Sequence, residues 1–282
     1  FRADGSLDLP QLAAHARGVI ARGCVGVTAF GTTGEGSSLG IADRHQMLGA
    51  LHGAGLDFRA SLVGGVMASS LGDAAEQSRL VLDAGGRALL LAPPFYFKCV
   101  SDEGLFAWFS ALFETLGAAA RDVILYNIPS VTAVPLSLGL VGRLRTAFPE
   151  IVIGVKDSSG DWPHTRALLA EHRDLAILVG DERHLAEAVR LGAQGAISGL
   201  ANIAPERLLP LAVEGRNDEG IVRVVEGVLR FPVTPAVKSL LADQSGFAGW
   251  RHVRAPLRAL SDGEAATLRD GLAGVLPAPA AA

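Results

Sequence analysis

Lys156 is the residue of this sequence with the clearest capacity for covalent chemistry. It ends the apolar run at residues 151–156 and is followed by Asp157. Apolar surroundings disfavour the charged form of an amine, and a neutral amine attacks a ketone to form a Schiff base. The structural alternative is a lysine whose stem packs on a strand while its ammonium reaches solvent. The sequence leaves both readings open and makes Lys156 the first candidate nucleophile.

A glycine-rich segment, residues 31–36 (Gly-Thr-Thr-Gly-Glu-Gly), follows the apolar run at residues 24–30. Backbone N–H groups in such a turn, together with the hydroxyls of Thr32 and Thr33, can hold an anionic oxygen. The segment is not a Walker loop, because no Gly-Lys-Ser/Thr follows, and its glycine spacing differs from the dinucleotide fingerprint. An anion-binding loop and an ordinary turn with threonine caps both remain open.

Both tyrosines of the chain also follow apolar runs. Tyr126 ends the run at residues 123–126, and Tyr96 comes shortly after the run at residues 88–92. A phenol can pass a proton between a bound oxygen and water, although a single tyrosine is more often a packed aromatic with a bonded hydroxyl. Because both tyrosines share this placement with the lysine and the threonine pair, we favour a common site.

The other ionisable residues indicate structure rather than chemistry. The seven histidines form no His-Glu-x-x-His pattern, and Cys24 and Cys99 are too few for a disulfide framework or a metal cage. We therefore expect no metal and no cofactor. Asp181 and Glu182 are interpreted as the cap of a helix, with substrate binding as the alternative. Lys238 lies in a helical pattern and is expected to be structural.

Short apolar runs and longer amphipathic segments alternate along the chain, and they must position these residues. Runs of four to seven residues rich in Val, Ile and Leu suit strands of a parallel sheet that is buried on both faces. The runs lie at residues 24–30, 60–63, 88–92, 123–126, 151–156, 176–179 and 195–198. Helical spacing occurs between them, for example at residues 71–82 and 105–116, and Ser101, Pro163 and Pro205 mark expected helix starts.

This βα repeat predicts an α/β fold, a (β/α)8 TIM barrel. A closed barrel of this kind has eight strands, whereas seven are visible and the sequence begins at Phe1 without a methionine. We infer that the first strand is missing from the sequence given. The alternative is a doubly wound open sheet, which needs no eighth strand.

Beyond residue 200 the strand signal stops and only helical patterns remain. They lie at residues 205–213, 218–229, 234–242, 250–260 and 263–275. The first of these is expected to be the last helix of the barrel. We therefore predict a barrel over residues 1–214 and a C-terminal helical extension over residues 215–282, with a frayed end at residues 277–282.

The composition narrows the class of protein. Hydrophobic residues make up 49% of the 282 residues and charged residues 19%, which is typical of a globular chain rather than a disordered one. A net charge of −4 argues against nucleic acid or an anionic membrane as partner. No apolar run reaches the ~18–20 residues of a membrane span, and no secretory leader is visible. We expect a cytoplasmic protein.

Three motifs taken together resemble the dihydrodipicolinate synthase / N-acetylneuraminate lyase family. They are residues 31–35 (Gly-Thr-Thr-Gly-Glu), 126–129 (Tyr-Asn-Ile-Pro) and 154–157 (Gly-Val-Lys-Asp), and the likeness extends from near Phe1 to about residue 260. The resemblance implies a (β/α)8 barrel with a C-terminal helical extension and a homotetrameric assembly. It also implies a Schiff base between a lysine and pyruvate or another 2-oxo acid.

By this resemblance Lys156 is the Schiff-base lysine and Tyr126 the proton relay. Thr32 would link Tyr126 to Tyr96, and Tyr96 would reach into the site of a neighbouring subunit. Thr33 and its backbone would hold the carboxylate of the substrate. The further residues matched to the substrate pocket are Gly31, Ser158, Gly180 and Ile197.

Departures from the family pattern bear on the substrate. Val131 stands where the family's synthases carry an arginine for the carboxylate of their aldehyde substrate, and an apolar residue cannot form that bidentate contact. Arg183 is the nearest substitute by sequence. Gly199 stands where sialic-acid lyases carry a serine. Ser158 resembles the hydroxyl residue that lyase-type members use toward hydroxylated substrates.

We therefore predict a Schiff-base lyase, an aldolase or dehydratase, that acts on pyruvate or a related 2-oxo acid, with sugar-derived acids among the candidates. The first alternative is 4-hydroxy-tetrahydrodipicolinate synthase. A non-catalytic barrel that binds 2-oxo acids is a second alternative, less favoured because the candidate catalytic residues are all present. A barrel that binds a phosphorylated ligand is a third, opposed by the lack of a basic residue near residues 198–202.

Overall fold

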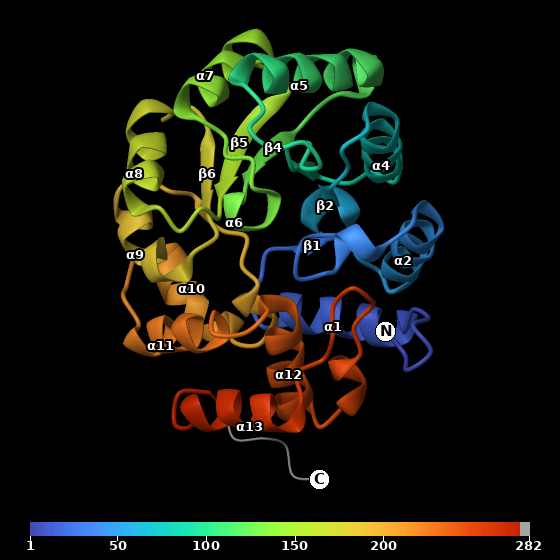
Figure 1. Ribbon diagram of the computed structural model, residues 1–282, viewed down its shortest axis with the longest axis vertical. Coiled ribbons are helices and arrows are strands. Elements are labelled where there is room, and N and C mark those ends of the chain that lie inside the picture. The colour runs from blue at the N-terminus through green and yellow to red at the C-terminus, as the bar shows by residue number, and fades with distance from the viewer. Residues whose placement is uncertain (277–282) are drawn as a thin grey trace.

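The computed structural model describes residues 1–276 and contains a curved parallel sheet with helices on its outer side (Figure 1). Within those residues the sheet has seven strands in chain order, and all neighbouring pairs are parallel. The strands are β1 (Val27–Ala29), β2 (Leu62–Val66), β3 (Ala88–Leu91), β4 (Val123–Asn127), β5 (Val152–Asp157), β6 (Ala176–Val179) and β7 (Gly195–Ala196). A doubly wound sheet reverses its strand order at a switch point, so this consecutive order rules that alternative out.

The strands and helices predicted up to residue 214 are present with small shifts of their ends. The helices of the βα units are α1 (Leu9–Ala21), α2 (Ile41–Gly53), α4 (Leu71–Asp83), α5 (Asp102–Leu116), α7 (Leu138–Ala147), α8 (Trp162–Glu171), α9 (Glu182–Arg190) and α10 (Pro205–Glu214). Short turns of helix lie between them: α3 (Phe58–Ser61), α6 (Pro129–Thr132), η1 (Gly36–Ser38), η2 (Gly117–Ala119) and η3 (Leu200–Asn202). The Ser101 hydroxyl accepts from Gly104 N at 3.2 Å and caps α5, while Pro163 and Pro205 lie in the first turns of α8 and α10, as predicted.

Side chains of the sheet are divided between two apolar clusters. Outward-facing residues such as Val123 and Leu125 of β4 pack against the helices in the main core. Inward-facing residues form a smaller inner cluster, which consists of Ala88, Leu90, Ala92, Ile124, Tyr126 and Ile128. The alternation along β4 therefore turns Tyr126 toward the barrel interior, as the pleat of a strand requires.

An irregularity in β5 decides which way Lys156 faces. Val123 pairs with Val152, but the next residue of β4, Ile124, pairs with Gly154, so β5 contains one extra residue at this point. Val152 and Val155 both belong to the outer core, which strict alternation would not allow. A one-residue change of register moves all later side chains to the opposite face, and Lys156 consequently pairs with the inward-facing Tyr126.

The C-terminal extension consists of α11 (Glu219–Val228), α12 (Val233–Ser245), the short turn η4 (Ala248–Arg251) and α13 (Asp262–Gly271). These helices lie together at the lower end of the molecule in Figure 1. The predicted helix over residues 250–260 is wrong, because residues 252–261, between η4 and α13, form no helix. Pro256 lacks a backbone N–H and restricts the residue before it to extended conformations.

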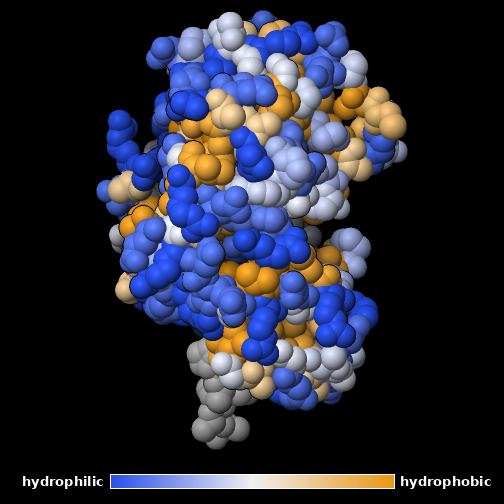
Figure 2. All heavy atoms as spheres, turned by 90° about the vertical axis from the view of Figure 1, so that its left-hand side faces the viewer, coloured by the Kyte–Doolittle hydropathy of each residue, from blue (hydrophilic) through white to orange (hydrophobic). Residues whose placement is uncertain are grey.

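The predicted domain boundary stays a prediction, although α10 ends beside it at Glu214, with Gly215 in the left-handed conformation. The predicted fraying of residues 277–282 lies outside the described residues. No helix in residues 1–276 has both the length and the apolar character needed to cross a membrane. The face that carries α8, α9 and α11 mixes hydrophilic side chains with smaller apolar areas (Figure 2).

Candidate active site

Lys156 and Tyr126 meet at the carboxyl ends of neighbouring strands. They are register partners on β5 and β4, and Lys156 Nζ donates a hydrogen bond to Tyr126 Oη at 3.1 Å. The same nitrogen lies 4.3 Å from the centroid of the Tyr126 ring. Only 8% of Lys156 and 2% of Tyr126 are exposed. The arrangement places an amine and a phenol together in the barrel interior, within reach of one small ligand.

Thr32 joins this pair from the loop that follows β1. Its Oγ1 lies 3.2 Å from Tyr126 Oη, and either hydroxyl can be the donor. The Tyr126 hydroxyl thus contacts the amine of Lys156 on one side and the hydroxyl of Thr32 on the other. A hydroxyl is both a donor and an acceptor, so the three groups form a connected path along which a proton can move.

Tyr96 is the one predicted catalytic residue that the structure does not bring to this path. It is 76% exposed, and its ring packs edge to face on Phe97 with centroids 5.3 Å apart. Its backbone N–H donates to Ser69 Oγ at 3.1 Å, whereas its hydroxyl bonds to no residue within 1–276. The predicted role of Tyr96 in a neighbouring subunit stays a prediction.

The residues matched to the substrate pocket lie at the same edge of the sheet. A methyl group added to Gly180 would lie 1.8 Å from Ser158 Oγ, so these two residues are in direct contact. A methyl group on Gly199 would lie 2.9 Å from Thr33 Cγ2, which places Thr33 opposite the segment after β7. Ile197 packs against the inner cluster that contains Tyr126.

Gly31 lies two residues after the end of β1 and precedes Thr32 in the loop. Its carbonyl accepts from Gly36 N at 3.0 Å and closes the glycine-rich turn. Gly36 is required there, because an added methyl group would lie 1.8 Å from the carbonyl oxygen of Phe30. The buried guanidinium of Arg44 holds the turn by donating to the Gly36 carbonyl at 2.8 Å, and burial lowers the pKa of Arg44 to about 10.

A buried polar network behind the site was not found from the sequence. Asn127 Nδ2 donates to Asp157 Oδ1 at 2.9 Å, and Thr165 Oγ1 donates to Asp157 Oδ2 at 2.6 Å. Asn127 and Asp157 are the residues immediately after Tyr126 and Lys156, and they pair with each other in the sheet. Their hydrogen bond holds the ends of β4 and β5 in register. Their position one residue beyond each candidate was the signal available in the sequence.

Asp181 and Glu182, which follow β6, have different surroundings. Asp181 caps α9 by accepting from Arg183 N at 3.1 Å, as predicted. Arg183 returns its guanidinium to the same carboxylate, with Nε 2.9 Å from Oδ1. This bidentate pairing engages the guanidinium of Arg183, the nearest substitute by sequence for the missing carboxylate clamp.

Glu182 is buried and accepts a hydrogen bond from the Ser198 hydroxyl. Loss of hydration on burial raises the pKa of the Glu182 carboxyl. Among residues 1–276, no group of three or more His, Cys, Asp and Glu side chains is arranged to hold a metal ion.

Comparison with known proteins places this geometry among related sequences and structures. The model of the dihydrodipicolinate synthetase family matches residues 1–273. An uncharacterized DapA-like lyase of Chloroflexus aurantiacus is 35% identical over 275 residues, which is 94% of this chain and 90% of the relative.

Two solved structures have the same fold over nearly the whole chain. The crystal structure of dihydrodipicolinate synthase from Agrobacterium tumefaciens has a TM-score of 0.95 and 53% identity, covering 98% of this chain and 96% of that chain. YagE, a prophage protein of the dihydrodipicolinic acid synthase family from E. coli K12 in complex with pyruvate, has a TM-score of 0.87 and 25% identity. That match covers 98% of this chain and 95% of YagE.

Proposed function

We propose, from the premise that the chain belongs to the dihydrodipicolinate synthetase family and is a lyase of that family, that it forms a Schiff base with pyruvate or a related 2-oxo acid through Lys156. The observation that carries this proposal is the hydrogen-bonded path from Lys156 Nζ through Tyr126 Oη to Thr32 Oγ1, with separations of 3.1 and 3.2 Å. The pyruvate bound to the related YagE supports the substrate class.

The reaction requires a nucleophile and a group that moves protons. The neutral amine of Lys156 adds to the C2 carbonyl, and the resulting carbinolamine loses water to give an iminium ion. Tyr126 delivers the proton that the departing hydroxyl needs and recovers one afterwards. The iminium accepts the electron pair of the C3–C4 bond when that bond breaks to give an enamine and an aldehyde, and the proton of the C4 hydroxyl passes to Tyr126. In the reverse direction the iminium of pyruvate loses a C3 proton to give the enamine, which attacks the aldehyde.

Trapping of the imine tests this chemistry directly. Borohydride reduces the iminium to a stable secondary amine, so wild-type protein incubated with pyruvate should gain the mass of the reduced adduct, and Lys156→Ala should not. Lys238→Arg is a useful additional sample because it removes the other buried lysine. A wild-type chain without adduct, or an equal adduct on Lys156→Ala, would refute the assignment.

The surroundings of the site favour a hydroxylated, sugar-derived 2-oxo acid over aspartate semialdehyde as natural substrate. Ser158 lies against Gly180, where its hydroxyl can meet a substrate hydroxyl. Val131 lies in α6 and is 63% exposed, and it offers no charge to a second carboxylate. The 53% identity to a structure named dihydrodipicolinate synthase supports the competing assignment, so the two must be separated by experiment.

The discriminating experiment measures pyruvate release from a panel of 2-keto-3-deoxy sugar acids and 4-hydroxy-2-oxo acids, beside condensation of pyruvate with aspartate semialdehyde. We expect cleavage of at least one sugar acid and poor condensation. Val131→Arg should improve condensation selectively. A wild-type kcat/KM for aspartate semialdehyde near 10⁴ M⁻¹s⁻¹ or above, roughly the lower end of ordinary enzymes, would instead establish the synthase.

We also propose a homotetramer in which Tyr96 completes the site of a neighbouring subunit. Its large exposed fraction and its contact with the exposed Phe97 support this role. Mixing Tyr96→Phe and Lys156→Ala subunits should restore activity, because each mixed pair then contains one site with an intact lysine and an intact partner tyrosine. Failure of the mixture, or a monomer in sedimentation equilibrium, would argue against it. The cytoplasmic location stays a prediction that cell fractionation would test.

A further inference from the structure

Helix α12 of the C-terminal extension contacts the loop that carries Thr32 at two places. Thr234 Oγ1 donates to the carbonyl oxygen of Thr32 at 3.3 Å. One helical turn later, Lys238 Nζ donates to Glu35 Oε1 at 2.6 Å. Residues four apart lie on the same face of a helix. One face of α12 therefore contacts both Thr32 and Glu35.

Both carboxylate oxygens of Glu35 accept hydrogen bonds from the extension. It is 4% exposed, and its second carboxylate oxygen accepts from the backbone N–H of Arg254 at 3.0 Å. Lys238 also donates to the carbonyl of His252. Loss of hydration lowers the pKa of Lys238, and the Glu35 carboxylate opposes that change. The two charges are thus paired and hydrogen-bonded inside the protein, where an unpaired charge would be strongly unfavourable.

The backbone of the loop transmits this contact to Thr32. Glu35 has a left-handed conformation with φ of 54°, and its N–H donates to the Thr32 carbonyl at 3.1 Å. The Thr32 carbonyl therefore accepts from both Glu35 and Thr234. Displacement of Glu35 must move the peptide of Thr32, and with it the hydroxyl that faces Tyr126.

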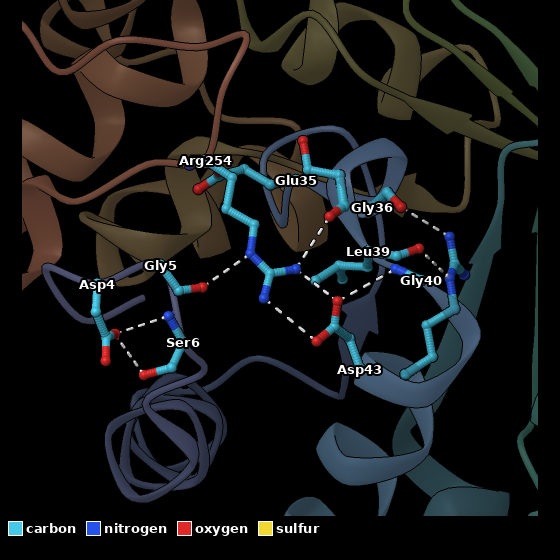
Figure 3. Close-up of polar contacts among 11 residues, drawn as sticks. Asp4, Gly5, Ser6, Glu35, Gly36, Leu39, Gly40, Asp43 and Arg254 are labelled. Carbon is cyan, nitrogen blue, oxygen red and sulfur yellow. Dashed lines mark hydrogen bonds and ion pairs between the residues drawn. The ribbon is translucent and has the colours of Figure 1, made fainter.

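A second tether fixes the far end of the same loop. The guanidinium of Arg254 binds both oxygens of Asp43, at 2.5 and 3.2 Å, and the carbonyl of Ser38 at 3.1 Å. Figure 3 shows Arg254 reaching from the extension to Asp43 beside Glu35 and Gly36. The extension thereby contacts the loop at Thr32, Glu35 and Ser38.

We infer that Thr234, Lys238 and Glu35 are positioning residues for the proton path, and that the extension sets the distance between Thr32 and Tyr126. This inference rests on the proposed function. Productive geometry must be held within about 0.5 Å, and a displacement of about 1 Å can reduce a rate by about 100-fold. Loosening this contact should therefore lower kcat while the substrate still binds.

A purely structural role makes a different prediction. If the contacts only attached the extension, their loss would lower stability without slowing the folded enzyme. Asp243, also on α12, provides the matched control, because it pairs with Arg251 at 2.8 Å and lies outside the loop contacts. Asp243→Asn should lower the thermal midpoint and leave kcat unchanged.

The experiment compares Thr234→Val, Thr234→Ser, Lys238→Met and Asp243→Asn in the full chain. It measures the rate of borohydride-trapped adduct formation with pyruvate, steady-state kcat and KM on the cleaved substrate, and the thermal midpoint. Thr234→Val should lose about 3- to 10-fold in kcat and Lys238→Met about 10- to 100-fold, with KM changed less than about 3-fold. Thr234→Ser keeps the hydroxyl and should recover most of the rate.

Three outcomes would overturn the inference. Thr234→Val and Thr234→Ser with equal, wild-type kcat would remove the positioning role, and this pair decides the matter even if Lys238→Met fails to fold. A kcat loss in Asp243→Asn as large as that in Thr234→Val would show that the contacts of Thr234 and Lys238 only stabilise the fold and do not position Thr32. A wild-type chain that traps no pyruvate adduct would overturn the proposed function, and this inference with it.

Discussion

The hydroxyl of Thr32 offers a direct measure of the proposed proton path. Thr32→Val keeps the β-branched shape and removes the hydroxyl that lies 3.2 Å from Tyr126 Oη. Tyr126→Phe removes the phenol hydroxyl itself, which is also 3.1 Å from Lys156 Nζ. The two substitutions and their combination form a double-mutant cycle around one hydrogen bond, and they measure whether Thr32 acts through Tyr126.

The expected loss of kcat depends on the group that each substitution removes. A proton-transfer group contributes about 10²- to 10⁴-fold, so Tyr126→Phe should lose that much in kcat. A neutral hydrogen bond has a net value of about 0.5–1.5 kcal/mol, and about 1.4 kcal/mol corresponds to tenfold in rate. Thr32→Val alone should therefore lose about 2- to 13-fold. In the Tyr126→Phe background the same change should be nearly silent, because the threonine hydroxyl has lost its partner.

The assay is steady-state kcat on the cleaved sugar acid, with the rate of borohydride-trapped adduct formation as a second readout. Circular dichroism should show wild-type folding for all three variants, since Val fits the volume of Thr and Phe that of Tyr. Additive losses in the double variant would refute the proposed path, because Thr32 would then act independently of Tyr126. A Thr32→Val enzyme with unchanged kcat would refute it as well.

Three further predictions concern the loop and the strand ends. Gly36→Ala should lower the free energy of unfolding by about 2–3 kcal/mol in urea titrations, because the new methyl group would lie 1.8 Å from the Phe30 carbonyl oxygen; an unchanged midpoint would show that the turn can shift. Arg44→Met should cost about 2–4 kcal/mol in the same titration by leaving buried carbonyls without donors. Burial raises the pKa of Glu182 above 4.5, so its folded form holds a proton that the unfolded chain releases, and stability falls as pH rises through the raised pKa. Glu182→Gln should lack this fall, and parallel stability profiles of the two proteins above pH 4.5 would contradict the prediction.

The placement of the site was predictable because parallel strands bring their carboxyl ends to one edge. Lys156 and Tyr126 each stand at the end of an apolar run, and the structure makes them register partners. The consecutive strand order agrees with the barrel that the βα repeat and the family resemblance together predicted, whereas the repeat alone also fits a doubly wound sheet. These features depend on local patterns of apolar residues, which a sequence displays directly.

Other features depend on contacts between distant segments, and the sequence does not display them. The sequence around Lys238 shows only a helical pattern. It does not indicate the partner Glu35, because Glu35 lies 203 positions away. The helix at residues 250–260 was predicted from apolar spacing, although Pro256 disfavours a helix in that range. The extra residue in β5 was likewise invisible, because Ile153 and Gly154 read as ordinary members of an apolar run.

That extra residue makes the site sensitive to the length of β5 as well as to its composition. Counting from Val152, Lys156 reaches the barrel interior only because one residue is unpaired opposite β4. Removing the unpaired residue would restore plain alternation and leave Lys156 paired with Tyr126, because the lysine would then lie three positions after the outward-facing Val152. Plain alternation at the present length would instead place it four positions after Val152 and carry the amine into the layer between sheet and helices. The side of the sheet on which Lys156 lies is therefore set by the length of β5 and its unpaired residue together, and not by the residue types alone.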